Sequence, residues 1–352
     1  MNFTRTTTRT TDISRRTAAA AMLALLAACG GGGGGGDAAP APGGGGTDPG
    51  TPAPAPAPAP APEPAPTPPT TPALVTGQYR LAAASTDFAG ALAAMNAQGA
   101  QGYAFLSTLG ASQGTFGDFY VSDTAHAGAR LEYATQPIAA SADAALAQMN
   151  AQGAQGFLYK APMAFSSGSD LRSLYVRDAS RSNTYSYERQ PITGAVSRAA
   201  FDAQLNAQGA RGYRFFGPLM AGSDSFSLYG KDASATTYAY TVRDAGAANG
   251  AALLQQLNEL GAQGFVYVGA LLVEGSTVAL FEKSSAQNGP VEYRVEESSQ
   301  GSLDQLVARL NERAAQGFFF FSDVGLSDGK IYTLSVKNAV GLRHPLAGPT
   351  FP

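Results

Sequence analysis

The sequence is poor in the residue types that most often carry chemistry. Its 352 residues include one cysteine, two histidines and no tryptophan, and 14% are charged. One cysteine excludes a disulfide framework. The histidines, His126 and His344, lie outside any shared motif, so we expect two exposed loop residues and no metal cluster or Ser-His-Asp arrangement. The carboxylates are scattered and do not form a recognisable glycosidase pair. The sequence therefore predicts no catalytic residue, no metal site and no cofactor.

The first 28 residues have the features of an export signal. A short apolar run, Thr17–Ala28, is well below the ~20 residues needed to span a bilayer. The run ends Leu26-Ala27-Ala28-Cys29, which resembles the lipobox of bacterial lipoproteins. That resemblance implies that residues 1–28 are removed and that Cys29 is acylated. The positive charges expected before such a run are Arg5, Arg9, Arg15 and Arg16.

The residues around the signal also indicate where the protein is sent. Gly30 follows Cys29 where lipoproteins retained in the inner membrane usually carry aspartate, so the resemblance implies the outer membrane, on its periplasmic or its surface side. Ser14-Arg15-Arg16 resembles a twin-arginine signal only weakly, and general secretion is favoured. The net charge of −3 gives no reason to expect nucleic acid or anionic lipid as a partner.

Residues 29–74 have the composition of a disordered tether. Glycine runs at 30–36 and 43–46 are typical of flexible coil, and the Pro-Ala alternation from Pro52 to Pro66 favours polyproline II. At ~3.1 Å per residue, the Pro-Ala stretch would reach roughly 45 Å. We interpret this segment as a passive spacer between the lipid anchor and the folded part.

One motif recurs along the rest of the chain. It reads Leu or Met, Asn, two residues, a small residue, two residues, Gly and an aromatic residue, and its copies begin at Met95, Met149, Leu205, Leu257 and Leu310. A tandem period of ~54 residues is typical of one supersecondary unit copied along the chain.

Each copy has the same order of structural signals. A segment that alternates with period two, such as Thr184–Glu188, predicts a half-buried strand. A helix follows, and in the fifth copy Ser302 and Gln305 have the spacing of a capping box. Two more strands then form a hairpin, as at Tyr103–Leu109 and Phe116–Ser122 in the first copy. The predicted unit is β-α-β-β.

The glycines of the motif lie just after the predicted helix. We expect the first, such as Gly99, to end the helix in the left-handed conformation. The second, such as Gly102, would turn the chain into the next strand. The fifth copy has Ala314 at the first position, so its cap is expected to be looser or differently built. Phosphate binding is disfavoured because these glycines follow a helix and do not open one.

The order of elements and the motif resemble a small bacterial family called domain of unknown function 4177. The fourth copy, Leu257–Phe265, is the best match, although the family's usual Trp-Glu after the second glycine is absent here. The resemblance covers residues 78–338 and implies a fold but no functional residues. We therefore expect an α+β fold of five tandem β-α-β-β repeats packed into one array, which could be an open row, paired sheets or a closed ring. The expected repeats are 75–125, 126–180, 181–234, 235–286 and 287–338, followed by an extended tail, 339–352, along the last repeat.

The last strand of three copies ends with an aromatic residue and, two residues later, a cation. Strand alternation places the two on one face. One interpretation is a ligand-facing platform repeated along the array. The other is packing between repeats, with the cation stems lying over aromatic rings, and this is favoured because contact between repeats is what an array needs most. The candidates are Tyr175 with Arg177, Tyr229 with Lys231, and Phe281 with Lys283.

These observations predict a lipid-anchored, non-enzymatic binding or scaffolding module of the bacterial envelope. Its partners would be the membrane, through the anchor, and an envelope protein or glycan, since tandem repeats suit multivalent contact. Two alternatives stay open. One is a hydrolase of cell-wall glycan with its site between repeats, and the other is a purely structural spacer.

Overall fold

The computed structural model describes residues 73–85, 87–110, 114–165, 170–194, 196–298 and 301–352. The predicted signal peptide, Cys29 and all but the last two residues of the predicted tether lie outside these residues. The folded part described below runs from Leu74 to Pro352. No helix in the described ranges is long and apolar enough to cross a membrane.

Strands and helices alternate along the described residues in one recurring order, strand, helix, strand, strand, here called a module. Module 1 holds β1 (Gly77–Ala83), α1 (Phe88–Gly99), β2 (Ala104–Gly110) and β3 (Phe116–Asp123). Module 2 holds β4 (Leu131–Pro137), α2 (Ala142–Ala154), β5 (Leu158–Phe165) and β6 (Asp170–Asp178). Module 3 holds β7 (Tyr185–Pro191), α3 (Arg198–Ala210), β8 (Arg214–Ala221) and β9 (Asp224–Asp232).

The same order continues to the end of the repeat region. Module 4 holds β10 (Tyr238–Asp244), α4 (Gly250–Gly261), β11 (Val266–Val273) and β12 (Ser276–Ser284). Module 5 holds β13 (Glu292–Glu297), α5 (Leu303–Ala315), β14 (Phe319–Gly325) and β15 (Ile331–Lys337). The capping box at Ser302 and Gln305 forms at the start of α5 as predicted. The predicted mixture of helices and sheets is confirmed.

Each module forms its own antiparallel sheet of three strands, with the last strand in the middle. The strand orders are β1-β3-β2, β4-β6-β5, β7-β9-β8, β10-β12-β11 and β13-β15-β14. The first and second strands of a module are therefore the two edges of its sheet, and both edges need partners in a stable fold.

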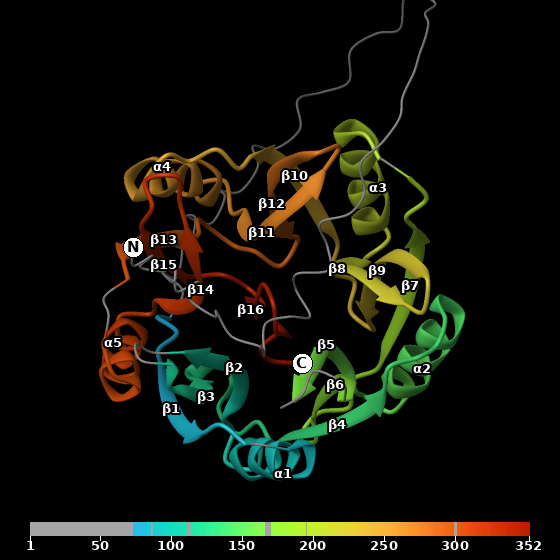
Figure 1. Cartoon of the computed structure of the whole chain (residues 1–352), viewed down its shortest axis with the longest axis horizontal. Coiled ribbons are helices and arrows are strands. Elements are labelled where there is room, and N and C mark those ends of the chain that lie inside the picture. Colours follow the sequence, from blue (N-terminus) through green and yellow to red (C-terminus); the bar gives the residue numbers. More distant parts are fainter. Residues whose placement is uncertain (1–72, 86, 111–113, 166–169, 195, 299–300) are drawn as a thin grey trace, which may run out of the picture. The chain divides into compact units, whose positions relative to one another are not determined.

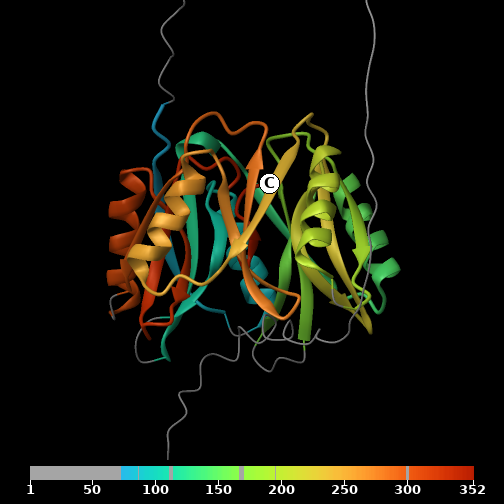
Figure 2. The ribbon, with the colours of Figure 1, turned by 90° about the horizontal axis from the view of Figure 1, so that it is seen from above.

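The modules close into a ring, which answers the question of arrangement that the sequence left open. Each helix packs on the first strand of the next module, α1 on β4, α2 on β7, α3 on β10 and α4 on β13, and α5 packs back on β1. Figure 1 shows the closed circle of modules, with the helices on its outside and the sheets around the centre. Figure 2 gives the side view.

Asparagine and tyrosine side chains join the edges of neighbouring sheets. Asn96 accepts a hydrogen bond from the backbone N–H of Tyr133 at 2.7 Å and donates one to its carbonyl at 3.2 Å. The Tyr133 hydroxyl accepts from the backbone N–H of Phe105 at 2.7 Å, in the preceding module. The closing interface repeats this pattern between modules 5 and 1, where Asn311 binds both backbone groups of Tyr79 and the Tyr79 hydroxyl accepts from Phe320 N–H. The motif asparagine therefore occupies the open edge of the next sheet.

The prediction for the first motif glycine is wrong. Gly99, Gly153, Gly209 and Gly261 are helical residues at the ends of their helices. A Cβ on any of them would overlap a backbone carbonyl of the next module's first strand, namely that of Leu131, Tyr185, Tyr238 or Val291. Glycine is needed there because the helix approaches that strand closely, and the backbone conformation is an ordinary one.

The second motif glycine provides the left-handed turn. Its φ lies between +81° and +87° in all five modules. The N–H of Gly102 donates to the carbonyl of Gly99, and the N–H of Tyr103 donates to that of Gln98, which is a Schellman cap. The same bonds form around Ala314 in module 5, so the expectation of a looser cap there is also wrong.

The sequence predicts an extended C-terminal tail along the last repeat, and this prediction is wrong. The C-terminal segment folds into two short paired strands, β16 (Arg343–His344) and β17 (Gly348–Pro349). β16 contacts β14 and β17 contacts β5, so the segment connects modules 5 and 2 across the ring (Figure 1). Next to the end of the chain, Phe351 stacks on His126 of the short helix η3 (Thr124–His126), with ring centroids 4.0 Å apart.

Candidate functional site

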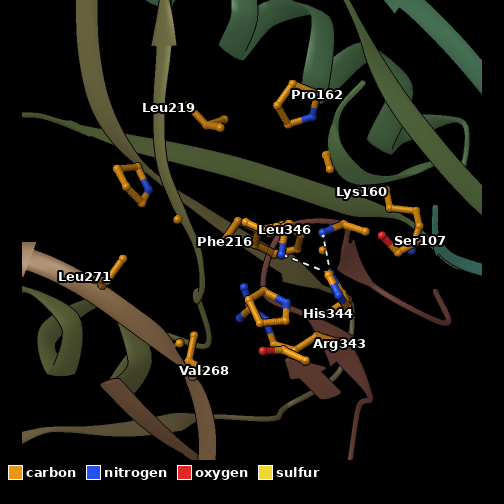
Figure 3. A pocket seen from close by; sticks show the side chains of 18 of the residues that line it. Ser107, Lys160, Pro162, Phe216, Leu219, Val268, Leu271, Arg343, His344 and Leu346 are labelled. Carbon is orange, nitrogen blue, oxygen red and sulfur yellow. Dashed lines mark hydrogen bonds between the residues drawn. The ribbon is translucent and has the colours of Figure 1, made fainter. Parts of the chain in front are cut away.

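A cavity of about 1680 Å³ occupies the centre of the ring. It is lined by the second strand of every module, β2, β5, β8, β11 and β14, and by the C-terminal segment. Pockets for small molecules usually measure about 300–1,000 Å³, so this one has room for a large ligand. Figure 3 shows the cavity with side chains from several modules directed into it.

Each lining strand carries a β-bulge, and bulges re-aim side chains. The register shifts between Phe105 and Ser107, between Tyr159 and Ala161, and at the equivalent places in β8, β11 and β14. The extra residues are Leu106, Lys160, Phe216, Val268 and Phe321. Lys160, Phe216 and Val268 line the cavity. Module 2 is the only module in which the residue at the bulge is charged.

One end of the cavity is surrounded by apolar side chains at the tips of the five hairpins. They stand on the last or next-to-last pair before each hairpin turn, and all of them line the cavity. Four are large and between 39% and 51% exposed. We call this set the apolar collar: Phe116, Leu171, Met220, Leu272 and Ile331.

The C-terminal segment crosses the cavity at the other end of the lining strands. Pro349 contacts Lys160 near the start of β5, Arg343 contacts Phe215 near the start of β8, and His344 stacks on Phe320 near the start of β14. The collar lies at the opposite ends of these strands. The cavity therefore has a mouth, where the apolar collar lies together with the carboxylates of Glu274 and Glu297. It also has a floor, which we define as Lys160, Arg343 and His344. Figure 3 shows the wall residues Leu219, Pro162 and Leu271 apart from the floor residues Arg343 and His344.

Lys160 is a buried cation without a carboxylate partner among the described residues. Its side chain donates to the carbonyl oxygen of Pro349 at 2.6 Å, and the residue is 2% exposed. Burial lowers the pKa of Lys160 to about 7, because water no longer stabilises the ammonium. A lysine ammonium has three N–H donors, so two remain beyond the bond to Pro349.

Arg343 is a second buried cation on the floor. Its Nη1 donates to the carbonyl of Phe215 at 3.0 Å, while its buried Nε has no hydrogen-bond partner in the described part of the chain. Burial, followed by the charge of Arg214, lowers the pKa of Arg343 to about 10, so the guanidinium stays charged at neutral pH. Arg214 is itself paired with Glu282 at 2.8 Å.

The expectation that His344 is an exposed loop residue is wrong. It is 5% exposed, and its Nδ1 accepts from the backbone N–H groups of Leu346 and Ala347, each at 3.2 Å. These two bonds assign the proton of the neutral ring to Nε2, which is then a donor. Burial, and next the charge of Lys160, lower the pKa of His344 to about 3. His126 at the surface is half-buried and paired with Asp123 at 2.8 Å.

This buried histidine leads to a prediction about acid stability. The pKa of His344 is about 3 in the folded protein against about 6.5 in an unfolded chain. As the pH falls from 6.5 to 3, the unfolded chain gains a proton that the folded protein excludes. The free energy of unfolding therefore falls, by an amount on the order of 4 kcal/mol.

In His344→Asn the amide oxygen can accept the same two backbone bonds but does not titrate. Urea unfolding at pH 6.5 and pH 4 should show a smaller loss of stability in the variant than in the natural protein. Equal losses in both proteins would contradict the prediction.

None of the six candidates from the sequence lines the cavity. Tyr175, Tyr229 and Phe281 are each 0% exposed, so the proposal that these rings face a ligand is corrected: they belong to the core. Arg177 lies over the ring of Phe157 at 4.7 Å. The cations otherwise stay near the surface: Arg177 pairs with Glu132, Lys231 donates to the carbonyl of Arg211 at 2.8 Å, and Lys283 is half-buried.

The carboxylates around the cavity already have partners. Glu297 pairs with Lys330 at 2.6 Å, Asp323 accepts from the Thr333 hydroxyl at 2.7 Å, and Glu274 accepts from the backbone N–H of Arg198 at 3.3 Å. Within the described residues, no group of three or more His, Cys, Asp or Glu side chains is placed to hold a metal ion.

Comparison with known proteins gives one family. A family model described as "PT dipeptide repeat lipoprotein" matches residues 60–225, just under half of the chain, from the predicted tether into module 3. This match supports a bacterial lipoprotein repeat family. It suggests a membrane-anchored protein of the bacterial envelope. No curated protein and no solved structure matches the chain. The resemblance to domain of unknown function 4177 stays a prediction.

The floor of the cavity was not predicted, although the sequence carries a signal for one of its residues. Aligning the five copies on the second glycine places Lys160 opposite Leu106, Phe216, Val268 and Phe321. A lysine at a position that is otherwise apolar marks a local exception to a repeated core. Arg343 and His344 lie outside the repeats, and no comparison of copies could have found them.

Proposed function

We propose that this chain is a lipid-anchored protein of the bacterial envelope, built from five copies of one β-α-β-β repeat, that binds a ligand in the central cavity without transforming it. The observation that carries the proposal is the cavity of about 1680 Å³ enclosed by all the modules. The match to the lipoprotein family supports the anchor and the location. Gly30, next to Cys29, favours the outer membrane over the inner membrane as the site of the anchor.

The walls of the cavity favour binding over a purely structural role. Protein interiors pack about as densely as organic crystals, and a spacer would gain stability by filling its centre with side chains. This ring instead leaves a large space and exposes four large apolar side chains at its mouth. Clustered exposed apolar residues are typical of binding sites.

The polar groups of the cavity favour binding over hydrolysis. Glu274, Glu297 and Asp323 each have a partner, as described above. The buried groups on the floor are cationic or neutral, and a general acid-base pair of carboxylates, which a glycan hydrolase needs, is not among them.

The test uses a neutral apolar fluorescent probe, N-phenyl-1-naphthylamine, with the full chain carrying Cys29→Ser so that acylation cannot occur. We expect saturable binding of the probe. Leu219→Arg, which puts a charge into the apolar wall, should weaken binding at least about tenfold, because burying an unpaired charge is costly. Mass spectrometry of a bound amphiphile should find it unchanged after prolonged incubation.

The control is the same substitution at Leu74, which is 50% exposed and does not line the cavity. Leu74→Arg should bind the probe as the natural protein does. The absence of saturable binding, or equal binding by Leu219→Arg, would contradict a site inside the ring. A covalently altered amphiphile would contradict the non-enzymatic part of the proposal.

A further inference from the structure

The two ends of the cavity differ in chemical character. The mouth carries the apolar collar, and the walls continue with Met163, Leu219 and Leu271. The floor holds two buried cations and a histidine, and these three residues are between 2% and 6% exposed. A molecule that fills this space completely needs an apolar body and a polar end.

The floor has more hydrogen-bond donors than acceptors. Lys160 has donors beyond its bond to Pro349, the buried Nε–H of Arg343 has no partner in the described residues, and the neutral ring of His344 presents Nε2–H. The carbonyls of Pro349 and Phe215 are already used by the two cations. The chemistry that satisfies such a floor is an acceptor that carries negative charge.

An unpaired buried cation destabilises the folded protein, and binding of an anion beside it reduces this destabilisation. A charge removed from water is destabilised unless it is paired and hydrogen-bonded. Lys160 shows that penalty in its pKa, which burial lowers to about 7 with no carboxylate opposing the shift. Charge-assisted hydrogen bonds to an oxyanion are about twice as strong as neutral ones. The floor therefore discriminates in favour of an anionic head group.

We propose that the ligand is a single-chain anionic amphiphile of the fatty-acid class. Its carboxylate binds at the floor, at Lys160 with Arg343 and His344 as further donors, and its hydrocarbon chain lies along the walls toward the apolar collar. This inference rests on the proposed function, since it names the ligand class of the same cavity.

The positive charge of the floor excludes an amphiphile with a cationic head group. A cationic amphiphile would bring a third positive charge beside Lys160 and Arg343, and the burial of these two residues weakens the screening of the repulsion by water. A neutral alcohol of the same length would gain the apolar contacts but could not pair with the cations. The three head groups therefore separate the apolar contribution from the electrostatic one.

The experiment measures displacement of the naphthylamine probe by three C12 amphiphiles, dodecanoate, dodecanol and dodecyltrimethylammonium, each below its micelle concentration. The protein is the full chain carrying Cys29→Ser at pH 6, where Lys160 is protonated and dodecanoate is charged. We expect dodecanoate to bind at least about tenfold more tightly than dodecanol, and the ammonium to bind more weakly than either.

A matched pair of variants tests the assignment of the head group. Lys160→Met keeps the length of the side chain and removes its charge, so it should lose the preference for dodecanoate while dodecanol still binds. Lys160→Arg should keep the preference. Lys283→Met removes a lysine that does not line the cavity and should change neither affinity. Binding of dodecanol by Lys160→Met also shows that this variant is folded.

The outcomes separate the two proposals. Equal binding of dodecanoate and dodecanol, or a preference that survives in Lys160→Met, overturns the anionic head-group site and leaves the binding function standing. If neither the probe nor any amphiphile binds to the natural sequence, both proposals fail. Preference for the ammonium overturns the inference directly.

Discussion

Gly209→Ala is expected to reduce the free energy of unfolding by about 3 kcal/mol, although alanine is normally the better helix residue by about 1 kcal/mol. The reason is contact with the next module. A Cβ at Gly209 would overlap the carbonyl oxygen of Tyr238 and approach its carbon. The helix would have to move away from β10, and overpacking of this kind costs about 1–3 kcal/mol or more. Urea unfolding followed by circular dichroism measures the loss.

Gly246→Ala is the control. Gly246 has no heavy atom within 4 Å of an added Cβ, and its φ is not in the left-handed region. We expect its stability to change by less than about 0.5 kcal/mol. If Gly209→Ala is as stable as Gly246→Ala, the close approach of helix and strand is not what requires glycine.

Asn96→Ala is expected to reduce the free energy of unfolding by about 2–4 kcal/mol. The Asn96 amide binds both the N–H and the carbonyl of Tyr133, which lies on the open edge of the second sheet. Alanine would leave two half-buried backbone groups without partners, each worth about 1–3 kcal/mol when unsatisfied. Partial access of water keeps the total below the full sum.

Two further variants make the Asn96 result specific. Asn96→Asp keeps the acceptor for the Tyr133 N–H but loses the donor to its carbonyl. The stability of this variant should therefore lie between that of Asn96→Ala and that of the natural protein. Gln101→Ala removes an exposed amide just after the same helix and should have little effect. An Asn96→Ala protein as stable as Gln101→Ala would show that the edge contact contributes nothing.

Local patterns were sufficient for the elements of this fold. Alternation in Val291–Val295 and the spacing of Ser302 and Gln305 depend on interactions within a few residues, and the strand and the capping box form there. The turn at Gly102 was predicted for the same reason, since its left-handed φ is decided locally.

The errors concern residues whose role depends on the next module. Gly99 looks like a helix terminator in its own segment, yet the atom that requires it is the carbonyl of Leu131. Ala314 is tolerated in α5, and the β1 strand on which α5 packs has Gly77 where the other first strands carry side chains. A pattern read along one copy contains no information about such contacts.

The floor of the cavity shows the same limit more strongly. The tail contains Pro345, Pro349 and Pro352 and reads as an extended end, because nothing nearby in sequence can bury it. Only after the ring has closed does a space exist that holds Arg343 and His344. The location of the candidate site therefore depended on the arrangement of modules, which the sequence left open.

Closure of α5 on β1 also determines how the protein can come apart. An open solenoid has two end repeats, each with a single neighbour, and it can fray inward from either one. In this ring every module has a neighbour on both sides, and Tyr79 is held by residues 232 and 241 positions away in the chain. No module can be released without breaking two interfaces at once. The ring is thus suited to unfold as a single cooperative body, with no terminal repeat at which stepwise unravelling could begin.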